Sequence, residues 1–373
     1  MSEVSEVSEV SEVSEVRHRA KFDGEGNEFF KVFLINALLT LVTFGVYFFW
    51  AKVRIKKFMF QHTEIAGGRF DYHVTGKEKF LAFLKAMLVV GVVVAIYMGI
   101  LYLMAMSFSY TVATIITTLV FYLLMLFVYP LIFVAVRRFN MSRTSWNSVH
   151  FRFTGRPKKL FFIAIKGFIL SIITLGFYTP WFIVSMQKFN IDGTYAGNKK
   201  FSFSGKGKDL MIPHLVIVGS FVVAFLVMMF IIFMAMLDGS GGTRPPAAIM
   251  LLSTSLTMVI IYGAIFWSYV WLMRYTWNHT KLGDDIKFSS DITSWKFFGY
   301  ILLASLISVA SLGLAMPWVI VMMTRYMVQT VSVHGDLNPA DLQGDPDSSE
   351  TSAFAEGLGE AGDFFDIIAD FLT

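Results

Sequence analysis

The sequence predicts an all-α polytopic membrane protein, in which broken helices and transmembrane helical hairpins repeat along the chain and short cytoplasmic β-hairpins join them. The first observation is composition: 55% of the 373 residues are hydrophobic, 16% are charged, and the mean hydropathy is +0.62. The second is that several apolar runs reach about 20 residues, the length that crosses a bilayer core. The third is a motif that occurs five times, each time at the end of an apolar segment.

About seven hydrophobic segments make up a predicted membrane domain over residues 29–334. They cover residues 29–50, 81–106, 112–136, 160–184, 210–237, 247–273 and 297–324. The second and third segments are joined by "MSFSYT", and the fifth and sixth by "LDGSGGTRPP". Because both connectors are short and nearly free of bases, we interpret these segments as two helical hairpins that cross the membrane and return.

Two acidic regions flank this domain. Residues 1–28 contain the unit "SEV" five times from Ser2 to Val16, and we expect a disordered, low-complexity N-terminus rather than an export signal. Residues 335–373 carry ten acids and no Lys or Arg after Gly335, which predicts a mostly disordered cytoplasmic tail. Only its end, "FFDIIADFLT", has the spacing of a short amphipathic helix.

The first, fourth and seventh segments share a helix-breaking signature. Residues 43–50 are "TFGVYFFW", residues 174–181 "TLGFYTPW" and residues 311–318 "SLGLAMPW", which indicates an internal repeat. In the last two, Gly176 and Gly313 precede Pro180 and Pro317 by four residues. Glycine suits the end of one helix and proline the first turn of the next. A kinked but continuous helix is the alternative, since both residues are common inside membrane helices.

The motif that occurs five times places a tryptophan or leucine, a base, an aromatic residue and a threonine at constant spacing, with proline or phenylalanine at its start. Its members are Trp50, Lys57, Phe58 and Thr63; Pro130, Arg138, Phe139 and Thr144; Pro180, Trp181, Lys188, Phe189 and Thr194; Trp267, Arg274, Tyr275 and Thr280; and Pro317, Trp318, Arg325 and Tyr326, with Val331 in place of threonine. Tryptophan and base are seven residues apart, so they share a helical face about 10 Å apart in height. We expect the base at the lipid headgroups, the aromatic residue in the interfacial belt, and the tryptophan deeper.

Each of the first four copies is followed by a β-hairpin signal. The stretches "TEIAGGRFDYHVTG", "TSWNSVHFRFTG", "TYAGNKKFSFSG" and "TKLGDDIKFSS" have a central turn of Gly, Asn or Asp and then an alternating run. Phe70 with Tyr72, Phe151 with Phe153, and Phe201 with Phe203 are expected on one face. The fifth copy has no clear aromatic run after it.

The distribution of charge bears on topology. Residues 29–334 hold 28 bases and nine acids, and 27 of those bases lie in or beside the junctions or before the first segment. If the three broken segments cross fully, matching junctions face opposite sides of the membrane. If they dip in and return at the break, every junction and both termini face the cytoplasm. The positive-inside tendency favours re-entrant segments, and full spans remain the alternative.

At these motifs the chain resembles a bacterial family of multi-pass inner-membrane proteins named for YjgN. The resemblance rests on "TLGFYTPW", "TYAGNKKFSFSG" and "FWAKVRIKKF", and covers about residues 20–335. It implies a multi-pass protein of the bacterial inner membrane. The family is one of unknown function, so the resemblance implies no catalytic residues. The seventh segment departs from the pattern in its Val331 and in the missing aromatic run.

Few side chains suggest chemistry, and we expect no enzyme, no catalytic residue, no cofactor and no metal. The chain has no cysteine, phosphate-binding loop or nucleophile elbow. His62 and His279 each precede a motif threonine, and we interpret them as solvated interfacial residues rather than a metal pair. The basic balance of a membrane protein indicates topology and not nucleic acid.

Two function classes remain. The first is passive or gated transport of a small solute or lipid, because broken helices form the sites of many transporters. The alternative is a structural or regulatory scaffold, whose basic junctions bind anionic lipid headgroups at the cytoplasmic face or a protein partner. The main intramembrane polar residues are Asn36, Thr40, Thr43, Thr111, Thr114, Thr117, Thr118 and Thr254. We expect the threonines to bond to carbonyls of their own helices, and the alternative, which transport predicts, is a polar lining around a cavity at the three broken segments. A scaffold predicts a packed, dry centre. The solute, the partner and the oligomeric state stay open.

Overall fold

Helix pairs alternate with strand pairs along the chain. The computed structural model describes residues 17–237 and 247–342. Its helices are α1 (Gly26–Val42), α2 (Phe48–Gln61), α3 (Gly76–Ser107), α4 (Tyr110–Ser142), α5 (Pro157–Ile173), α6 (Thr179–Asp192), α7 (Met211–Leu237), α8 (Ala247–Asn278), α9 (Ser294–Ala310), α10 (Met316–Gln329) and the short 3-10 helix η1 (Pro339–Leu342). Its strands are β1 (Arg17–Arg19), β2 (Lys21–Phe22), β3 (Thr63–Ile65), β4 (Gly68–Tyr72), β5 (Thr144–Trp146), β6 (Val149–Phe153), β7 (Thr194–Ala196), β8 (Lys199–Phe203), β9 (Thr280–Leu282), β10 (Ile286–Ser290) and β11 (Val331–His334).

The two predicted hairpins are present as α3–α4 and α7–α8. Within the described residues, three helices are long and apolar enough to cross a membrane: Tyr110–Ser142, Met211–Met234 and Ala247–Asn278. A capping box begins α3, in which the Thr75 side chain accepts from the Glu78 amide and Glu78 accepts from the Thr75 amide. This reciprocal pairing satisfies backbone donors where α3 leaves the sheet.

The three broken segments are true breaks and not kinks. The chain leaves the helix at two consecutive left-handed residues in each: Phe44 and Gly45, Leu175 and Gly176, and Leu312 and Gly313. The Thr174 hydroxyl donates to the Leu170 carbonyl at 2.7 Å and accepts from the Tyr178 amide at 2.9 Å, so it links the end of α5 to the start of α6. Pro180 then lies in the first turn of α6, where its missing N–H costs nothing.

Substitution of Gly176 by alanine is expected to lower the free energy of unfolding by about 1–2 kcal/mol, because its φ of +93° disfavours any side chain. Gly219, inside helix α7, is the control, and alanine there is expected to be neutral or stabilising by up to about 1 kcal/mol. Apart from chain neighbours and, for Gly219, the backbone of its own helix, no described atom lies within 4 Å of a Cβ at either position, so steric crowding does not contribute to the expected difference. Thermal unfolding in detergent measures both, and equal shifts would contradict the assignment.

The predicted all-α class is wrong, because the β-hairpins join into one 11-stranded, nearly closed sheet. The order is β1-β11-β10-β9-β8-β7-β6-β5-β4-β3-β2, with antiparallel neighbours. Each hairpin pairs with the next: Phe70 lies opposite Trp146, and Phe151 lies opposite Ala196. The alternating pattern identifies each hairpin. It does not show that one hairpin pairs with the next, because two helices separate them along the chain. A shared sheet is therefore decided by contacts distant in sequence.

The sheet is closed by residues 17–22, which we call the closing segment. Arg17–Arg19 pairs with β11 and Lys21–Phe22 pairs with β3, so the N-terminal segment takes the place of the second hairpin strand, which the fifth motif copy lacks after β11. The predicted boundary of a disordered N-terminus at residue 28 is therefore wrong for residues 17–28. Within the predicted acidic tail, Pro339–Leu342 forms η1. The SEV repeats and the predicted amphipathic end lie outside the described residues.

The inner face of the sheet is filled with apolar side chains. Four phenylalanines on the alternate strands β4, β6, β8 and β10, with ring centroids 5.8–6.4 Å apart, form a continuous row: Phe70, Phe151, Phe201 and Phe288. Ala20 of the closing segment is buried on the same face. Leu342 of η1 is buried in the cluster that contains Trp146 and Val333, so η1 covers the opening at the hairpin tips.

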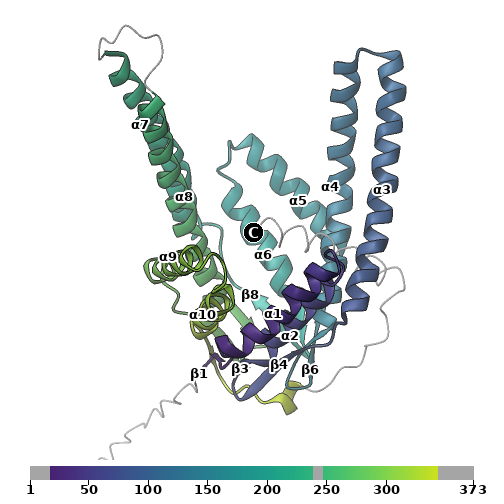
Figure 1. Ribbon diagram of the computed structural model, residues 1–373, viewed down its shortest axis with the longest axis vertical. Coiled ribbons are helices and arrows are strands. Elements are labelled where there is room, and N and C mark those ends of the chain that lie inside the picture. Colours follow the sequence, from purple (N-terminus) through teal and green to yellow (C-terminus); the bar gives the residue numbers. More distant parts are fainter. Residues whose placement is uncertain (1–16, 238–246, 343–373) are drawn as a thin grey trace, which may run out of the picture.

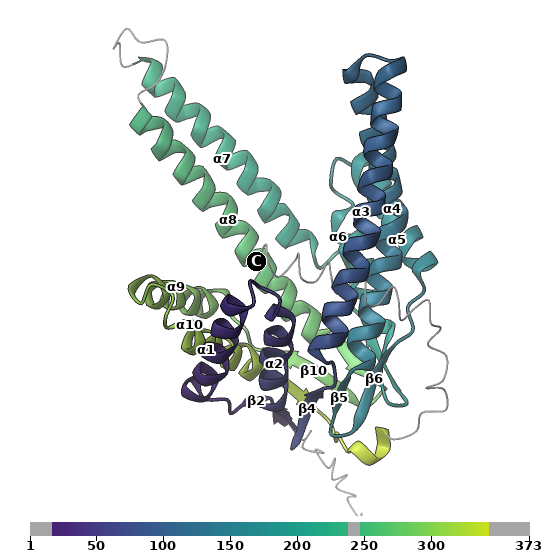
Figure 2. The same ribbon diagram turned by 45° about the vertical axis from the view of Figure 1, so that its right-hand side comes forward.

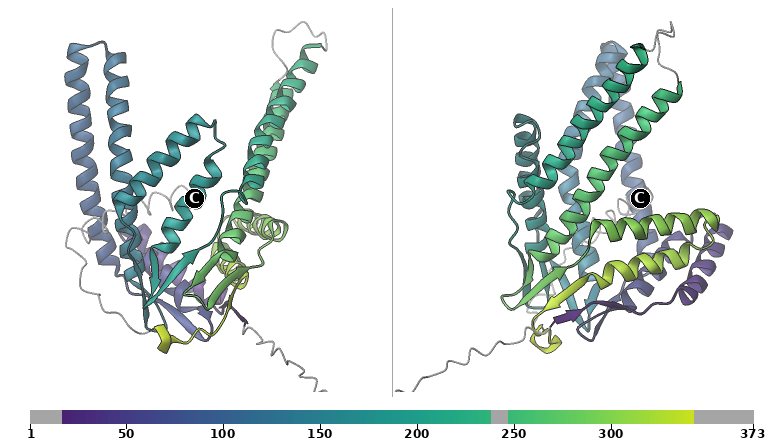
Figure 3. Two further views of the ribbon diagram at one scale, coloured as in Figure 1. Left: turned by 180° about the vertical axis from the view of Figure 1, so that it is seen from behind. Right: turned by 90° about the vertical axis from the view of Figure 1, so that its left-hand side faces the viewer.

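All five helix pairs rise from one side of this sheet (Figure 1). Figure 2 shows α7–α8 and α3–α4 diverging from the sheet, with α1–α2 and α9–α10 beside it. In the right-hand view of Figure 3, α9 and α10 lie across the direction of α7 and α8. Each pair starts and ends at the sheet, because every helix pair is flanked by strands of the same sheet. The five junctions therefore lie at one end of the molecule.

Candidate functional site

The motif aromatics pack inside the protein, where three are buried and two are partly buried. Phe58 is buried with Phe22 and Phe29, and Phe189 packs edge-on against Phe153 at 5.8 Å. Tyr275 is buried with Phe203 and Leu210. Phe139 packs against the cluster around Tyr72, and Tyr326 stacks on Phe297. Each aromatic residue thus joins its helix to the sheet or, for Tyr326, to the preceding helix α9, a role that spacing along a single helix does not show.

The motif bases hold strand-to-helix loops in at least two copies. Arg138 donates to the Gly155 carbonyl at 2.9 Å, and Arg325 donates to the Gly24 carbonyl at 2.8 Å. The second bond links α10 to the loop between the closing segment and α1, across 301 residues. Lys188 and Arg274 are exposed and Lys57 is half-buried.

The motif threonines have a structural role as well. Each donates a hydrogen bond to the carbonyl four residues earlier, as seen for Thr63, Thr144, Thr194 and Thr280.

The tryptophans of the three broken segments pack on glycines at the start of a helix. Trp50 covers Gly76, Trp181 covers Gly207 and Trp318 covers Gly26, and a Cβ at any of these glycines would clash with the indole. In the other two copies, α4 has Pro130 inside the helix and Leu131 at the tryptophan position, and Trp267 is 36% exposed, close to the 40% of Trp318. In the broken segments, the tryptophan therefore packs one helix pair against the start of another.

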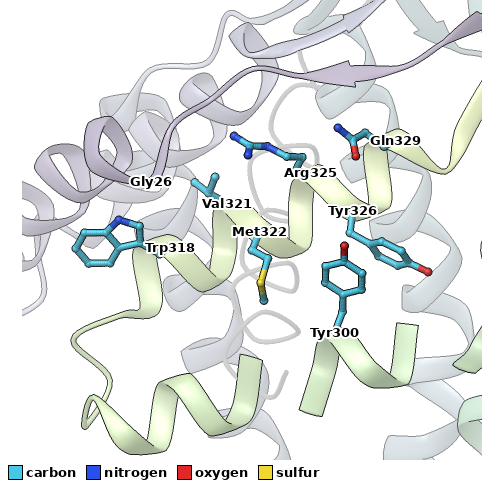
Figure 4. A pocket seen from close by; sticks show the side chains of 8 residues that line it. All are labelled: Gly26, Tyr300, Trp318, Val321, Met322, Arg325, Tyr326 and Gln329. Carbon is cyan, nitrogen blue, oxygen red and sulfur yellow. The ribbon is translucent and has the colours of Figure 1, made fainter. Parts of the chain in front are cut away.

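One such contact borders a pocket at the seam between α1 and α10 (Figure 4). The pocket has a volume of about 330 Å³ and is lined by Gly26, Tyr300, Trp318, Val321, Met322, Arg325, Tyr326 and Gln329. The indole of Trp318 donates to Asn27 Oδ1 at 3.0 Å, and the rings of Tyr300 and Tyr326 stack with centroids 4.2 Å apart. Its contacts join the first helix to the last, so we assign this pocket to ring closure.

Histidines and intramembrane hydroxyls have local roles. Nδ1 of His62 donates to the Phe58 carbonyl at 2.8 Å, and Nδ1 of His279 donates to the Tyr275 carbonyl at 2.9 Å. Among residues 17–237 and 247–342, no group of three His, Cys, Asp or Glu side chains could hold a metal. Five of the hydroxyls considered for a polar lining donate to carbonyls of their own helix: Thr40, Thr43, Thr114, Thr117 and Thr254.

Exposed lysines gather where the first helix of each pair leaves the sheet. We call them the entry lysines: Lys31, Lys77, Lys158, Lys159, Lys206, Lys208 and Lys296. They lie within two turns of the start of α1, α3, α5, α7 and α9, and the first turns of α5, α7 and α9 contain no acid. The sequence shows that these bases lie near the junctions. The shared sheet brings the junctions together, so the bases gather at the same end of the molecule.

A second, larger pocket lies between α2 and α4, on the helix side of β4. Its volume is about 650 Å³. Lys56 and Arg137 line one part of it, and apolar residues of α4, including Val128, Ile132 and Phe133, line another. None of these five is a member of the motif. The spacing of the motif does not reveal this pocket, because the pocket depends on the distance between two helices that the sheet places side by side.

Comparison with known proteins agrees with the resemblance noted from the motifs. A family model described as bacterial protein of unknown function (DUF898) matches residues 17–361. A protein named Inner membrane protein YjgN from Salmonella typhimurium is 23% identical over 380 residues, 90% of this chain and 93% of that protein. Its namesakes from Escherichia coli O157:H7 and strain K12 are 32% and 30% identical over 161 residues, 43% of this chain and 37% of each. No solved structure matches.

Proposed function

The chain belongs to the bacterial family of unknown function DUF898, and from that premise we propose that it is an inner-membrane scaffold whose entry lysines hold anionic lipid headgroups. Its relatives are named inner membrane proteins, and its long apolar helices fit that location. The role proposed is structural or regulatory and requires no catalysis.

The observation that carries this proposal is the position of the entry lysines at helix N-termini. A helix N-terminus carries about half a positive charge, so bases there are unfavourable and acids are favourable. Lys158 and Lys159 nevertheless begin α5, and Lys206 and Lys208 precede α7, with no acid in either first turn. Helix stability does not explain them. A layer of phosphates at the same level does, because each phosphate pairs with both the lysines and the helix end.

The arrangement of junctions supports a single membrane face for these lysines. Helix pairs that start and end at one sheet place their charged ends together, and the positive-inside tendency assigns that end to the cytoplasm. On this proposal α3–α4 and α7–α8 span the bilayer, while α1–α2, α5–α6 and α9–α10 re-enter and return. The shorter pairs fit this, since α5 has 17 residues and α6 has 14.

The alternative function, transport of a solute along the axis of the sheet, has less support than the scaffold role. A polar path would have to pass the row of four phenylalanines and the cluster around Trp146 and Leu342, all of which are apolar. The hydroxyls of Thr40, Thr114 and Thr254 bond to their own helices. A filled, apolar sheet centre is the feature expected of a scaffold.

Neutralising two entry lysines, Lys158→Gln with Lys206→Gln, is expected to lower the enrichment of anionic lipid around the protein. Each base near an anionic surface contributes about 1 kcal/mol, so removal of two has a measurable effect. The protein is reconstituted in nanodiscs of mixed phosphatidylglycerol and phosphatidylcholine, and the lipids that copurify on extraction are counted by mass spectrometry. Thermal stability should be unchanged or slightly higher, because unfavourable charges leave the helix N-termini.

The matched control is Lys200→Gln with Lys281→Gln, which removes the same charge from exposed positions on the outer face of the sheet. We expect it to leave lipid enrichment at the wild-type level. Equal loss in both double variants would show that net charge alone matters, and unchanged enrichment in the first would reject the proposal.

A further inference from the structure

The pocket between α2 and α4 has two chemically distinct parts. At the sheet end it is lined by Lys56 and Arg137, beside Tyr72 of β4. Away from the sheet, its wall consists of Met125, Val128, Ile132 and Phe133 on one face of α4. Its volume of about 650 Å³ falls in the range of about 300–1,000 Å³ that ligand sites occupy. A ligand that fits both parts must be an amphiphile.

The charge of the pocket selects an anion. Lys56 and Arg137 line it and no Asp or Glu does. The Lys56 ammonium lies 5.2 Å from the centre of the Tyr72 ring, and the Arg137 guanidinium lies 5.8 Å from that of Phe153. These contacts hold both cations beside the sheet, at the end of the pocket where the entry lysines also lie. Two cations in a partly apolar cleft attract an anion more strongly than in open water.

The pocket runs from the basic residues beside the sheet toward the middle of α4, and a lipid of the sheet-side leaflet has the same orientation. Met125, Val128 and Ile132 recur at helical spacing along α4, one of the three candidate membrane spans. An anionic group at Lys56 would place an attached chain along this wall, toward the middle of the span. Lipids of the sheet-side leaflet have this orientation, with headgroups at the basic junctions and acyl chains inward.

The paired cations occur at one seam among the five. Lys56 and Arg137 both lie six residues after the motif's tryptophan position, and the matching residues in the other copies are Gln187, Met273 and Thr324. Only the seam between α2 and α4 joins two copies with a base at this place. The site is therefore single, unlike the entry lysines, which occur at every helix pair.

We propose that this pocket binds one anionic glycerophospholipid, with its phosphate between Lys56 and Arg137 and an acyl chain along α4. This deepens the proposed function and rests on it, because it names one tightly held lipid within the bound set. The entry lysines exchange lipid with the bilayer. The pocket retains its lipid, because the apolar wall adds chain burial to the charge contacts.

Native mass spectrometry of the full chain, extracted from phosphatidylglycerol and phosphatidylcholine nanodiscs and delipidated by detergent washing, tests this site. One retained phosphatidylglycerol per chain is expected. Lys56→Gln and Arg137→Gln should each lower its occupancy about tenfold, because each removes a charge-assisted hydrogen bond to the phosphate. Val128→Trp, which fills the apolar wall without changing charge, should displace it as well. Because Arg137 packs on Phe153, thermal unfolding checks that each variant is folded.

The outcomes separate the possible ligands. No retained lipid, equal retention of phosphatidylcholine, or retention unaffected by Lys56→Gln and Val128→Trp would overturn the proposal. Displacement by glycerol phosphate or inorganic phosphate at the same concentration would show a free phosphate site, and displacement by palmitate would show a carboxylate site. Either result would overturn the assignment to a phospholipid.

The entry-lysine variant separates this proposal from the broader one. Lys158→Gln with Lys206→Gln should lose lipid enrichment and still retain the single pocket lipid. If the wild-type protein retains the pocket lipid but shows no enrichment of anionic lipid around it, only the proposed scaffold function is rejected. If anionic lipid is enriched but no lipid is retained after washing, only the proposed lipid site in the pocket is rejected.

Discussion

Removal of residues 2–22 is expected to abolish the folded state, whereas removal of residues 2–16 leaves the thermal unfolding temperature unchanged. The longer deletion removes the closing segment, so β11 and β3 lose one of their neighbours. It also removes Phe22, which is buried against Phe29 and Phe58. Loss of a buried phenylalanine side chain costs about 3–5 kcal/mol, and each lost backbone hydrogen bond adds about 1 kcal/mol. The sum approaches the entire stability of a typical domain, about 5–15 kcal/mol.

The measurement is the monodisperse yield after detergent extraction together with thermal unfolding. Phe22→Ala isolates the packing part of the effect, and it should lower stability without abolishing expression. The shorter deletion is the control, because strand pairing begins at Arg17. A protein without residues 2–22 that remained monodisperse and unfolded at the wild-type temperature would contradict the closing role.

Trp146→Ala is expected to lower the free energy of unfolding by about 3–5 kcal/mol, the range for large aromatic residues in a core. Trp146 is 3% exposed and lies in the cluster that fills the sheet. Its indole N–H lies 3.2 Å from the Ile65 carbonyl and 3.1 Å from the Gly68 carbonyl, so it also joins β5 to the β3–β4 turn. Alanine would leave a cavity and deprive both carbonyls of this donor.

Trp295→Ala provides the comparison, since Trp295 is 80% exposed at the start of α9. Exposed substitutions usually change stability by about 0.5 kcal/mol or less. Unfolding midpoints of both variants in the same detergent give the difference. A shift at Trp146 no larger than the shift at Trp295 would show that the sheet centre is not the core of the molecule.

Local patterns in the sequence were sufficient for the membrane class, the helix breaks and the β-hairpins. Apolar runs identify segments because lipid exposure demands continuous hydrophobicity. Gly176 with Pro180, and Gly313 with Pro317, identify breaks because each residue type has a backbone preference that acts within one turn. Alternating aromatics such as Phe151 and Phe153 identify strands for the same local reason. Each of these features depends on residues a few positions apart.

The roles of the motif residues required the tertiary structure. Phe58 and Phe189 suit a headgroup belt equally well when the helix is considered alone. They are buried because strands from the preceding part of the chain pack over them. Arg325 likewise has the spacing of an interfacial base, and its bond to the Gly24 carbonyl spans 301 residues. Constant spacing reveals that a position matters but not which neighbour it contacts.

Local sequence patterns thus identify a membrane protein with broken helices, hairpin junctions and bases gathered at those junctions. The folded chain adds that the hairpins form one sheet, that residues 17–22 close it, and that Lys56 and Arg137 line a common pocket. Strand pairing and pocket formation bring together residues separated by tens to hundreds of positions. Such contacts depend on the closure of the whole ring, and no window of local sequence contains that information.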